Sequence, residues 1–133
     1  MDMIITFDGK KKVNAEYRGQ TIHTDQAVKA GGDGEAPEPF TLFLASIGTC
    51  AGIYVKSFCD QRDIPTDNIR LIQSMNFNPE LRLIDQIDIQ LELPDDFPEK
   101  YKDAVINAAD LCTVKKHLAN PPKINVAVRQ QQD

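Results

Sequence analysis

Residues 83–93 are predicted to form a β-strand with one buried face, because apolar and polar residues alternate from Ile87 to Leu93. The apolar face consists of Ile87, Ile89, Leu91 and Leu93. Similar β-rich segments predict five further strands, at residues 3–7, 13–17, 21–24, 69–77 and 124–128. Asp8-Gly9 and Arg18-Gly19 are hairpin turn signals, so the first three strands are predicted to be antiparallel and joined by tight turns.

A long helix is predicted after the Gly/Pro-rich loop at residues 30–39. Pro39 suits a first helical turn, and Glu38 places negative charge near the positive end of the helix dipole. From Phe40 to Phe58 apolar residues occur on nearly every face, which predicts a central helix that is buried on all sides. The helix is expected to end near Arg62, before an Ile-Pro step.

A second helix is predicted from Asp96, which would act as its cap, with Pro98 in the first turn. Its apolar stripe has spacings of four, three and four residues: Tyr101, Val105, Ala108 and Cys112. Asn120-Pro121-Pro122 ends the helix before the last predicted strand. Neither an internal repeat nor a linker divides the sequence, so residues 1–133 are predicted to form a single domain.

The charge balance excludes several classes of partner. The 133 residues include 15 basic and 20 acidic residues, a net charge of -5, which argues against a nucleic-acid or anionic membrane surface. The longest uncharged run, residues 40–55, is shorter than a membrane span, and the N-terminus lacks a signal peptide, so a cytoplasmic protein is expected. The lysines at positions 10–12 are interpreted as a solvated strand edge rather than a phosphate site.

The three cysteines are too few and too scattered for a disulfide framework or a zinc site. Cys50 and Cys59 are nine residues apart in one predicted helix, on opposite faces and about 13 Å apart along its axis, so they cannot form a disulfide. Cys59 is interpreted as a packing residue or an exposed bystander. Cys50 and Cys112 lie on apolar helix faces that could meet, although buried cysteines are often simple core residues.

A reactive thiol needs a positively charged partner, because the thiolate is the nucleophile. Arg18 is the best candidate for this partner, although an arginine in a strand turn is more often a surface residue. A Cys–His hydrolase with Cys50 as its nucleophile is a further possibility, but the sequence offers no specific third residue to orient His23 or His117.

Two segments carry a resemblance to a known family. The segment from Pro37 to Cys50 (PEPFTLFLASIGTC), the segment from Cys112 to Leu118 and the 62-residue spacing of the two cysteines resemble the OsmC/Ohr family of thiol peroxidases, above all its OsmC-like branch. The similarity spans nearly the whole chain. It implies an α+β OsmC-like fold with antiparallel sheets around a long buried central helix, in an interlocked homodimer with two active sites at the subunit interface.

The resemblance also implies a chemistry that needs no metal or flavin cofactor. Cys50 corresponds to the peroxidatic thiol, which would attack an organic hydroperoxide, becoming a sulfenic acid and releasing an alcohol. Cys112 corresponds to the resolving thiol, which would form a disulfide with Cys50. A small dithiol or a lipoylated protein would then reduce this disulfide.

In the family an arginine, oriented by a glutamate, holds the reactive thiolate. Arg18 matches the position of the arginine, either within its own subunit or across the dimer. An alignment on Cys50 places Phe40 or Thr41 where the glutamate is expected, and Glu38 is the nearest acid. This departure motivates an alternative function, ranked after the peroxidase, in which a non-peroxidatic OsmC-like protein binds an apolar or thiol-containing small molecule at the dimer interface.

Overall fold

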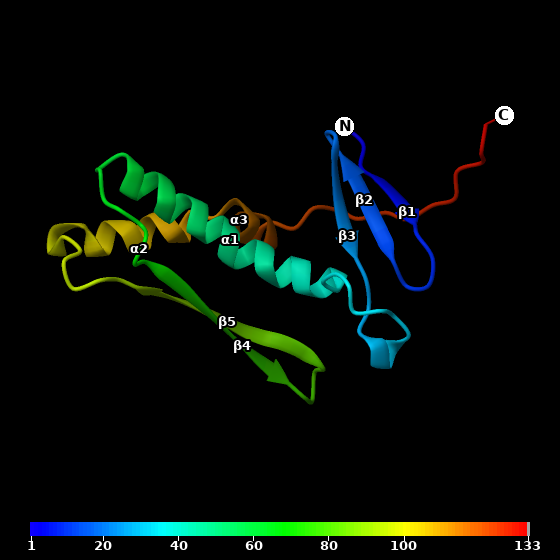
Figure 1. The fold of residues 1–133 in the computed structure, drawn as a ribbon, viewed down its shortest axis with the longest axis horizontal. Helices are drawn as coiled ribbons and strands as arrows, with labels where there is room; N and C mark the ends of the chain where they lie inside the picture. The colour runs from blue at the N-terminus through cyan, green and yellow to red at the C-terminus, as the bar shows by residue number, and fades with distance from the viewer. Residues whose placement is uncertain (133) are drawn as a thin grey trace. The chain divides into compact units, whose positions relative to one another are not determined.

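The computed structural model describes residues 1–132, which form two compact units, Met1–Ser46 and the residues from Ile47 onward. The first unit contains a three-stranded antiparallel sheet in the order β1-β2-β3 (Figure 1). Its strands are β1 (Ile4–Phe7), β2 (Val13–Tyr17) and β3 (Gln20–Thr24), so all three predicted strands are confirmed to within one residue. Arg18 and Gly19 form a two-residue turn with φ values of 51° and 77°, which matches the twist of the hairpin.

The loop that follows β3 is held by a buried carboxylate. Asp25 is fully buried and accepts hydrogen bonds from the backbone N–H groups of Gln26, Asp33 and Glu35. Its own N–H donates to the carbonyl of Pro37 at 3.2 Å, which brings the two ends of the loop together. A short 3₁₀ turn (Val28–Ala30) lies within this segment, which otherwise has the irregular structure that the sequence predicts.

Two lysines join this loop to the β1–β2 turn. Lys10 donates to Asp33 at 2.7 Å, and Lys12 forms ion pairs with Asp33, with Glu35 at 3.7 Å and with Asp25 at 3.9 Å. Hydrogen bonds from Lys10 and Lys12 lower the pKa of Asp33 to about 2. Lys10 and Lys11 are exposed to solvent as predicted, whereas Lys12 departs from this interpretation, because it is partly buried and the acidic loop supplies its counter-charges.

Helix α1 (Pro39–Asp60) confirms the predicted long helix and runs from the first unit into the second. In the second unit, β4 (Arg70–Asn78) and β5 (Leu83–Glu92) form an antiparallel hairpin, and its apolar and charged side chains alternate as predicted. The remaining elements are the 3₁₀ turn η2 (Glu99–Tyr101), α2 (Lys102–Asp110) and α3 (Thr113–Ala119).

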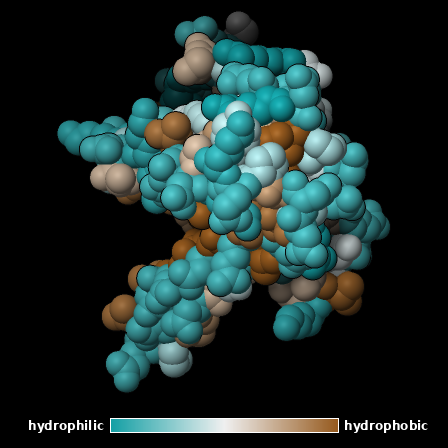
Figure 2. All heavy atoms as spheres, turned by 90° about the vertical axis from the view of Figure 1, so that its left-hand side faces the viewer, coloured by the Kyte–Doolittle hydropathy of each residue, from teal (hydrophilic) through white to brown (hydrophobic). Residues whose placement is uncertain are grey.

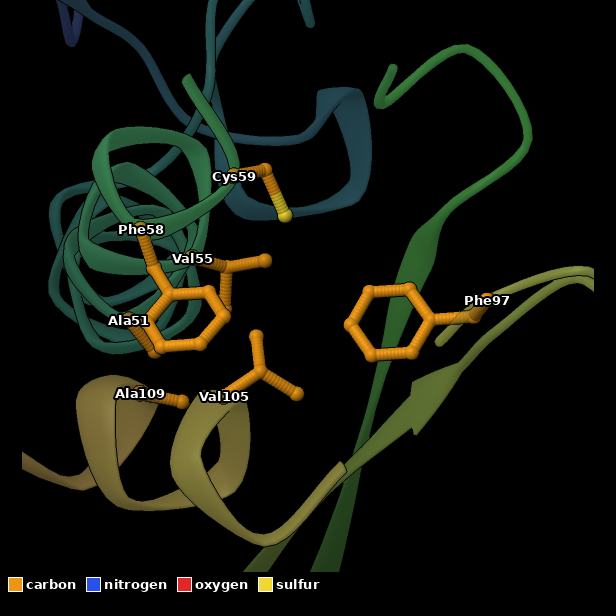
Figure 3. Packing of buried hydrophobic residues seen from close by; sticks show 7 residues of the cluster. All are labelled: Ala51, Val55, Phe58, Cys59, Phe97, Val105 and Ala109. Carbon is orange, nitrogen blue, oxygen red and sulfur yellow. The ribbon is translucent and has the colours of Figure 1, made fainter. Parts of the chain in front are cut away.

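The core of the second unit lies between α1 and α2. Figure 3 shows Val105 of α2 pointing toward α1, with Phe97 on one side and Phe58 on the other. The buried cluster comprises Ala51, Val55, Phe58, Cys59, Phe97, Val105 and Ala109. Apolar side chains of β4 and β5 pack against this cluster, so the hairpin covers part of the same face of α1.

The prediction that α1 is buried on all sides was wrong for the single chain. Its buried residues follow one stripe, Ile47, Ala51, Val55, Phe58 and Cys59. Phe40, Phe43 and Ile53 are 41–58% exposed, because the elements of one chain cover only one side of the helix. By length and composition α1 could cross a membrane, a property that it shares with the core helices of soluble proteins. In Figure 2, hydrophobic residues are visible in a hollow of the surface, with hydrophilic residues around them.

Three finer predictions also require correction. Residues 124–128 form no strand in the described part of the chain, and Ile124, Val126 and Val128 are 83–100% exposed, because no strand of the same chain pairs with them. Asp96 does not cap a helix, since η2 begins after Pro98 and has no side-chain cap. The second helix ends at Asp110, so Cys112 does not continue its stripe and instead caps α3.

Candidate functional site

The structure brings Cys50 and Cys112 together. Cys50 lies on α1 and is half-buried, whereas Cys112 precedes α3 and is only 3% exposed. The Cys112 thiol is within hydrogen-bonding reach of the Cys50 sulfur, and it also lies 3.8 Å from the carbonyl oxygen of Ile47. The single Cys112 proton therefore has two acceptors on α1, one of which is the sulfur of Cys50.

The position of Cys112 depends on the break between α2 and α3. Its backbone has φ -50° and ψ 125°, which is a non-helical conformation typical of a helix N-cap. The Cys112 sulfur accepts a hydrogen bond from the backbone N–H of Lys115 at 3.4 Å. A cysteine thus fills the capping position that serine, threonine or aspartate usually occupies, and the first turn of α3 points its other N–H groups toward Cys50.

The two thiols have opposite pKa shifts. The pKa of Cys50 is lowered by the backbone N–H of Val114, with further contributions from the Cys112 thiol and the N–H of Thr113, while burial opposes the shift. The pKa of Cys112 is raised, first by burial and also by the neighbouring Cys50. Cys50 therefore ionises first, and Cys112 remains protonated beside it and can donate a hydrogen bond to the thiolate.

Tyr54 is part of this site, although the sequence analysis did not identify it. Its hydroxyl oxygen lies 2.9 Å from Oγ1 of Thr113, so α1 is hydrogen-bonded to the first residue of α3. Tyr54 follows Cys50 by four residues and therefore lies on the same face of α1. This spacing is a signal in the sequence that could have identified Tyr54 as a neighbour of the Cys50 thiol.

Arg18 and Glu38 lie in the first unit. Arg18 is exposed in the β2–β3 turn, and its guanidinium lies 5.0 Å from the ring centre of Tyr17. Glu38 is half-buried just before α1, and its backbone carbonyl accepts a hydrogen bond from the N–H of Leu42. Within residues 1–132 no ion pair joins Arg18 to Glu38, so the role of this pair at Cys50 remains a prediction.

The remaining candidates lie elsewhere. Of the two interpretations of Cys59, the structure supports the packing residue and not the exposed one, because Cys59 is fully buried in the core, and burial raises its pKa. His117 is hydrogen-bonded through Nδ1 to the carbonyl of Thr113 at 2.8 Å, and His23 lies 3.1 Å from the side-chain oxygen of Asn14. No histidine contributes to the pKa shift of Cys50.

Among the described residues, no group of three or more potential ligands is placed to hold a metal ion.

A pocket of about 340 Å³ reaches Cys112 from α1, β5, α2 and α3. Its apolar lining comprises Ile47, Ala51, Ile87, Ile89, Leu91, Ile106, Ala109 and Leu118. Asn107, Asp110 and Lys115 are its polar lining residues, and the last two form an ion pair with each other. Cys50 is not among the lining residues, so the pocket gives access to one thiol of the pair.

Comparisons with known proteins agree with the resemblance in the sequence. Residues 32–127 match the model of the family described as OsmC-like protein. No curated protein matches the chain. A structure from Psychrobacter arcticus 273-4, described as an osmotic stress induced and detoxification response protein, is similar with a TM-score of 0.70 and 21% identity, over 86% of this chain and 85% of that one.

Two other similar structures are named as organic hydroperoxide resistance proteins. The protein OsmC from Legionella pneumophila has a TM-score of 0.50 and 16% identity, over 89% of both chains. The protein from Vibrio cholerae, with captopril bound in one of its active sites, has a TM-score of 0.52 and 14% identity, over 90% of this chain and 86% of that one. At these identities the likeness establishes the fold, which is a mixed α/β architecture with antiparallel sheets.

Proposed function

We propose that this chain, which belongs to the OsmC-like protein family, is a thiol peroxidase that reduces organic hydroperoxides to alcohols. The observation that carries the proposal is the pair of thiols with opposite pKa shifts, Cys50 lowered and Cys112 raised, within hydrogen-bonding reach of each other. Two of the similar structures are named as organic hydroperoxide resistance proteins, which supports the choice of substrate class.

The proposed reaction begins with the Cys50 thiolate. It attacks the terminal oxygen of the hydroperoxide, the O–O bond breaks, and the alkoxide takes up a proton and leaves as the alcohol. Cys50 is then a sulfenic acid. The sulfur of Cys112 attacks the Cys50 sulfur, which gives a disulfide and releases water. A dithiol or lipoylated protein reduces this disulfide to the two starting thiols.

Two residues of the first unit complete the proposed site. We assign to Arg18 the stabilisation of the Cys50 thiolate and of the departing oxygen, and to Glu38 the orientation of Arg18. A guanidinium is suited to both tasks, because it is always charged and donates several hydrogen bonds. The resemblance to the OsmC/Ohr family supports this assignment, in which Arg18 belongs either to the same subunit or to its partner.

We propose that the protein acts as a cytoplasmic homodimer. The exposed side of α1 and the apolar residues at 124–128 are surfaces that the single chain leaves uncovered. Burial of such surface is the main driving force for subunit association. A net charge of -5 at neutral pH does not favour binding to anionic membranes or nucleic acid.

The test is the reaction of the reduced protein with one equivalent of cumene hydroperoxide, followed by a count of free thiols and by peptide mapping. We expect the loss of two thiols, a disulfide between Cys50 and Cys112, and an intact Cys59 thiol. The Cys50→Ser variant should lose no thiol on the same timescale. A rate equal to that of free cysteine, unchanged in Cys50→Ser, would disprove the peroxidase function.

The apolar pocket favours a second candidate function, a non-peroxidatic protein that binds an apolar or thiol-containing small molecule. At about 340 Å³ the pocket has room for a small organic ligand, and a thiol lies in its wall. Native mass spectrometry of protein purified under mild conditions would detect such a ligand. A retained or covalently attached molecule, together with the loss of at most one thiol to peroxide, would favour binding over catalysis.

A further inference from the structure

We infer that the reductant attacks Cys112 rather than Cys50, and that it reaches Cys112 through the apolar pocket between α1, β5, α2 and α3. The inference rests on the proposed function, because it concerns the Cys50–Cys112 disulfide formed there. It adds the point of attack and the entry route of the reductant.

Access is the first argument. An incoming thiolate has to reach one sulfur of the disulfide while the other sulfur departs, so the sulfur that is open to the reductant decides the outcome. Cys50 is half-buried and Cys112 has only 3% of its surface exposed, but that surface of Cys112 forms part of the pocket wall. Because Cys50 does not line the pocket, a reductant held there meets Cys112 first.

The leaving group is the second argument. Thiol–disulfide exchange is faster when the departing thiol has the lower pKa. Attack on Cys112 releases Cys50, which is the thiol that the N–H groups of Val114 and Thr113 stabilise as an anion. Attack on Cys50 would instead release Cys112, whose pKa burial raises. Attack on Cys112 therefore returns Cys50 directly as the thiolate that the next peroxide molecule requires.

The lining of the pocket indicates the class of reductant. Eight apolar side chains suit an aliphatic chain, and they disfavour a reductant that is charged along its whole length. Asn107 can bind a terminal amide, whereas Lys115 is already paired with Asp110. The lining therefore suits the aliphatic chain of the dithiol reductant that the proposed function already includes.

The exchange is balanced in atoms and electrons. The first thiolate of the dithiol attacks Cys112, a mixed disulfide forms, and Cys50 leaves as a thiolate. The second thiol of the reductant loses its proton and attacks its own sulfur in the mixed disulfide. The reductant departs as a cyclic disulfide, oxidised by two electrons, and Cys112 takes up the proton to become a thiol again.

The first experiment locates the mixed disulfide. The full-length protein is oxidised with diamide, which does not depend on peroxidase activity, and the Cys50–Cys112 disulfide is verified by peptide mapping. It is then treated briefly with one equivalent of 6-mercaptohexanoic acid, a monothiol that has no second thiol to release itself from the mixed disulfide, and is quenched with acid and alkylated. We expect the mercaptohexanoate adduct on Cys112 and the alkyl label on Cys50, and we expect this product to be at least tenfold more abundant than the one with the adduct on Cys50. An adduct mainly on Cys50, or no Cys50–Cys112 disulfide, would overturn the inference.

The second experiment narrows the pocket. Ile106 lines the pocket and is 53% exposed, so Ile106→Trp should fold and fill part of the space. Leu81→Trp adds the same ring at a residue of similar exposure, 62%, in the β4–β5 turn outside the pocket. We expect Ile106→Trp to slow reduction of the diamide-formed disulfide by dihydrolipoamide at least tenfold, and Leu81→Trp to leave this rate unchanged.

The outcomes separate the two proposals. If Ile106→Trp slows oxidation by cumene hydroperoxide and not reduction by dihydrolipoamide, the pocket holds the peroxide and the inference is wrong. If the diamide-formed disulfide is reduced through Cys112 but cumene hydroperoxide does not react, the inference stands and the peroxidase function fails. If peroxide reacts and the adduct forms on Cys50, the peroxidase function stands and the inference fails.

Discussion

The hydroxyl groups of Tyr54 and Thr113 lie 2.9 Å apart and join the helix that carries Cys50 to the first turn of the helix that binds its sulfur. The N–H groups of Thr113 and Val114 lower the pKa of Cys50, so their position decides how much thiolate is present at neutral pH. Tyr54 is therefore a positioning residue, which acts on Cys50 through α3.

Replacing Tyr54 by phenylalanine should raise the pKa of Cys50. A hydrogen bond contributes about 0.5–1.5 kcal/mol, and one pKa unit corresponds to about 1.36 kcal/mol, so we expect a rise of at most about one unit. The measurement is a pH titration of thiolate absorbance at 240 nm in the Cys59→Ala background. The control is Tyr101→Phe, which removes a hydroxyl from a ring that packs edge-to-face against Phe58, away from α3. Equal pKa values in Tyr54→Phe and the parent would contradict the positioning role.

The proposed role of Arg18 in stabilising the Cys50 thiolate can be tested separately from its role in the β2–β3 turn. Arg18 has φ 51°, a conformation that asparagine adopts more readily than arginine, so Arg18→Asn should preserve or raise the melting temperature. If the guanidinium stabilises the Cys50 thiolate, the reaction with cumene hydroperoxide should slow by about 10- to 100-fold, the equivalent of a lost hydrogen bond to a charged group.

A matched control exists in the other hairpin. Arg82 has φ 56° in the β4–β5 turn, so Arg82→Asn removes the same charge from the same type of backbone conformation. Stopped-flow rates of both variants should differ by at least tenfold. Equal rates in Arg18→Asn and Arg82→Asn would show that Arg18 affects Cys50 only through the net charge of the protein and not from a specific position.

The buried thiol of Cys59 should make unfolding depend on pH. Because burial raises its pKa in the folded state, the unfolded chain loses this proton first as pH rises above about 8.5. The wild-type protein should then lose stability relative to Cys59→Ala, with a slope of at most about 1.4 kcal/mol per pH unit. Urea unfolding of both proteins between pH 7 and pH 10 measures this difference.

Cys50 provides a control of opposite sign. Its pKa is lowered in the folded state, so its contribution is fully present above the pKa of the unfolded thiol and is lost as pH falls through the folded value. The stability of the wild-type protein relative to Cys50→Ala should therefore increase with pH up to about 8.5. A difference that falls over this range would show that the Cys50 thiolate is not stabilised.

Homodimer formation should depend on the apolar residues near the C-terminus. Val126 is 95% exposed, so Val126→Asp cannot harm the packing of its own chain, yet it would place a charge in a subunit interface. We expect a shift from dimer to monomer in analytical ultracentrifugation, whereas Gln130→Asp, just beyond the apolar residues 124–128, should leave the dimer intact. A dimer that Val126→Asp does not weaken would exclude this segment from the interface.

Patterns of apolar residues predicted the elements of this fold well, because strands and helices place side chains with fixed periods. The alternation at Ile87, Ile89 and Leu91 specified both the strand and its exposed face. The same patterns did not predict what covers each surface. Apolar residues on all sides of α1 indicated that the whole helix is buried, but the other elements of one chain bury only one side of it. Burial of the other sides would need contacts that no local sequence pattern describes.

Of the predicted site residues, the structure brings Cys50 and Cys112 together, and it adds a stabilisation of the Cys50 thiolate that the sequence analysis did not include. The sequence analysis required a positively charged partner for Cys50, whereas in the second unit backbone N–H groups of α3 provide the stabilisation. The break between α2 and α3 could not be predicted, because neither glycine nor proline marks it and the residues from Tyr101 to Cys112 continue a helical stripe. Only the break makes Cys112 a cap.

The exposed residues 124–128 have a consequence for the protein in dilute solution. Ile124, Val126 and Val128 contact little of their own chain, so they add almost nothing to the folding free energy of a separate subunit. Their contribution appears only when another molecule covers them, and it then follows mass action. The melting temperature of the protein should therefore rise with its concentration, and the abundance of the protein in the cell would itself set part of its resistance to unfolding.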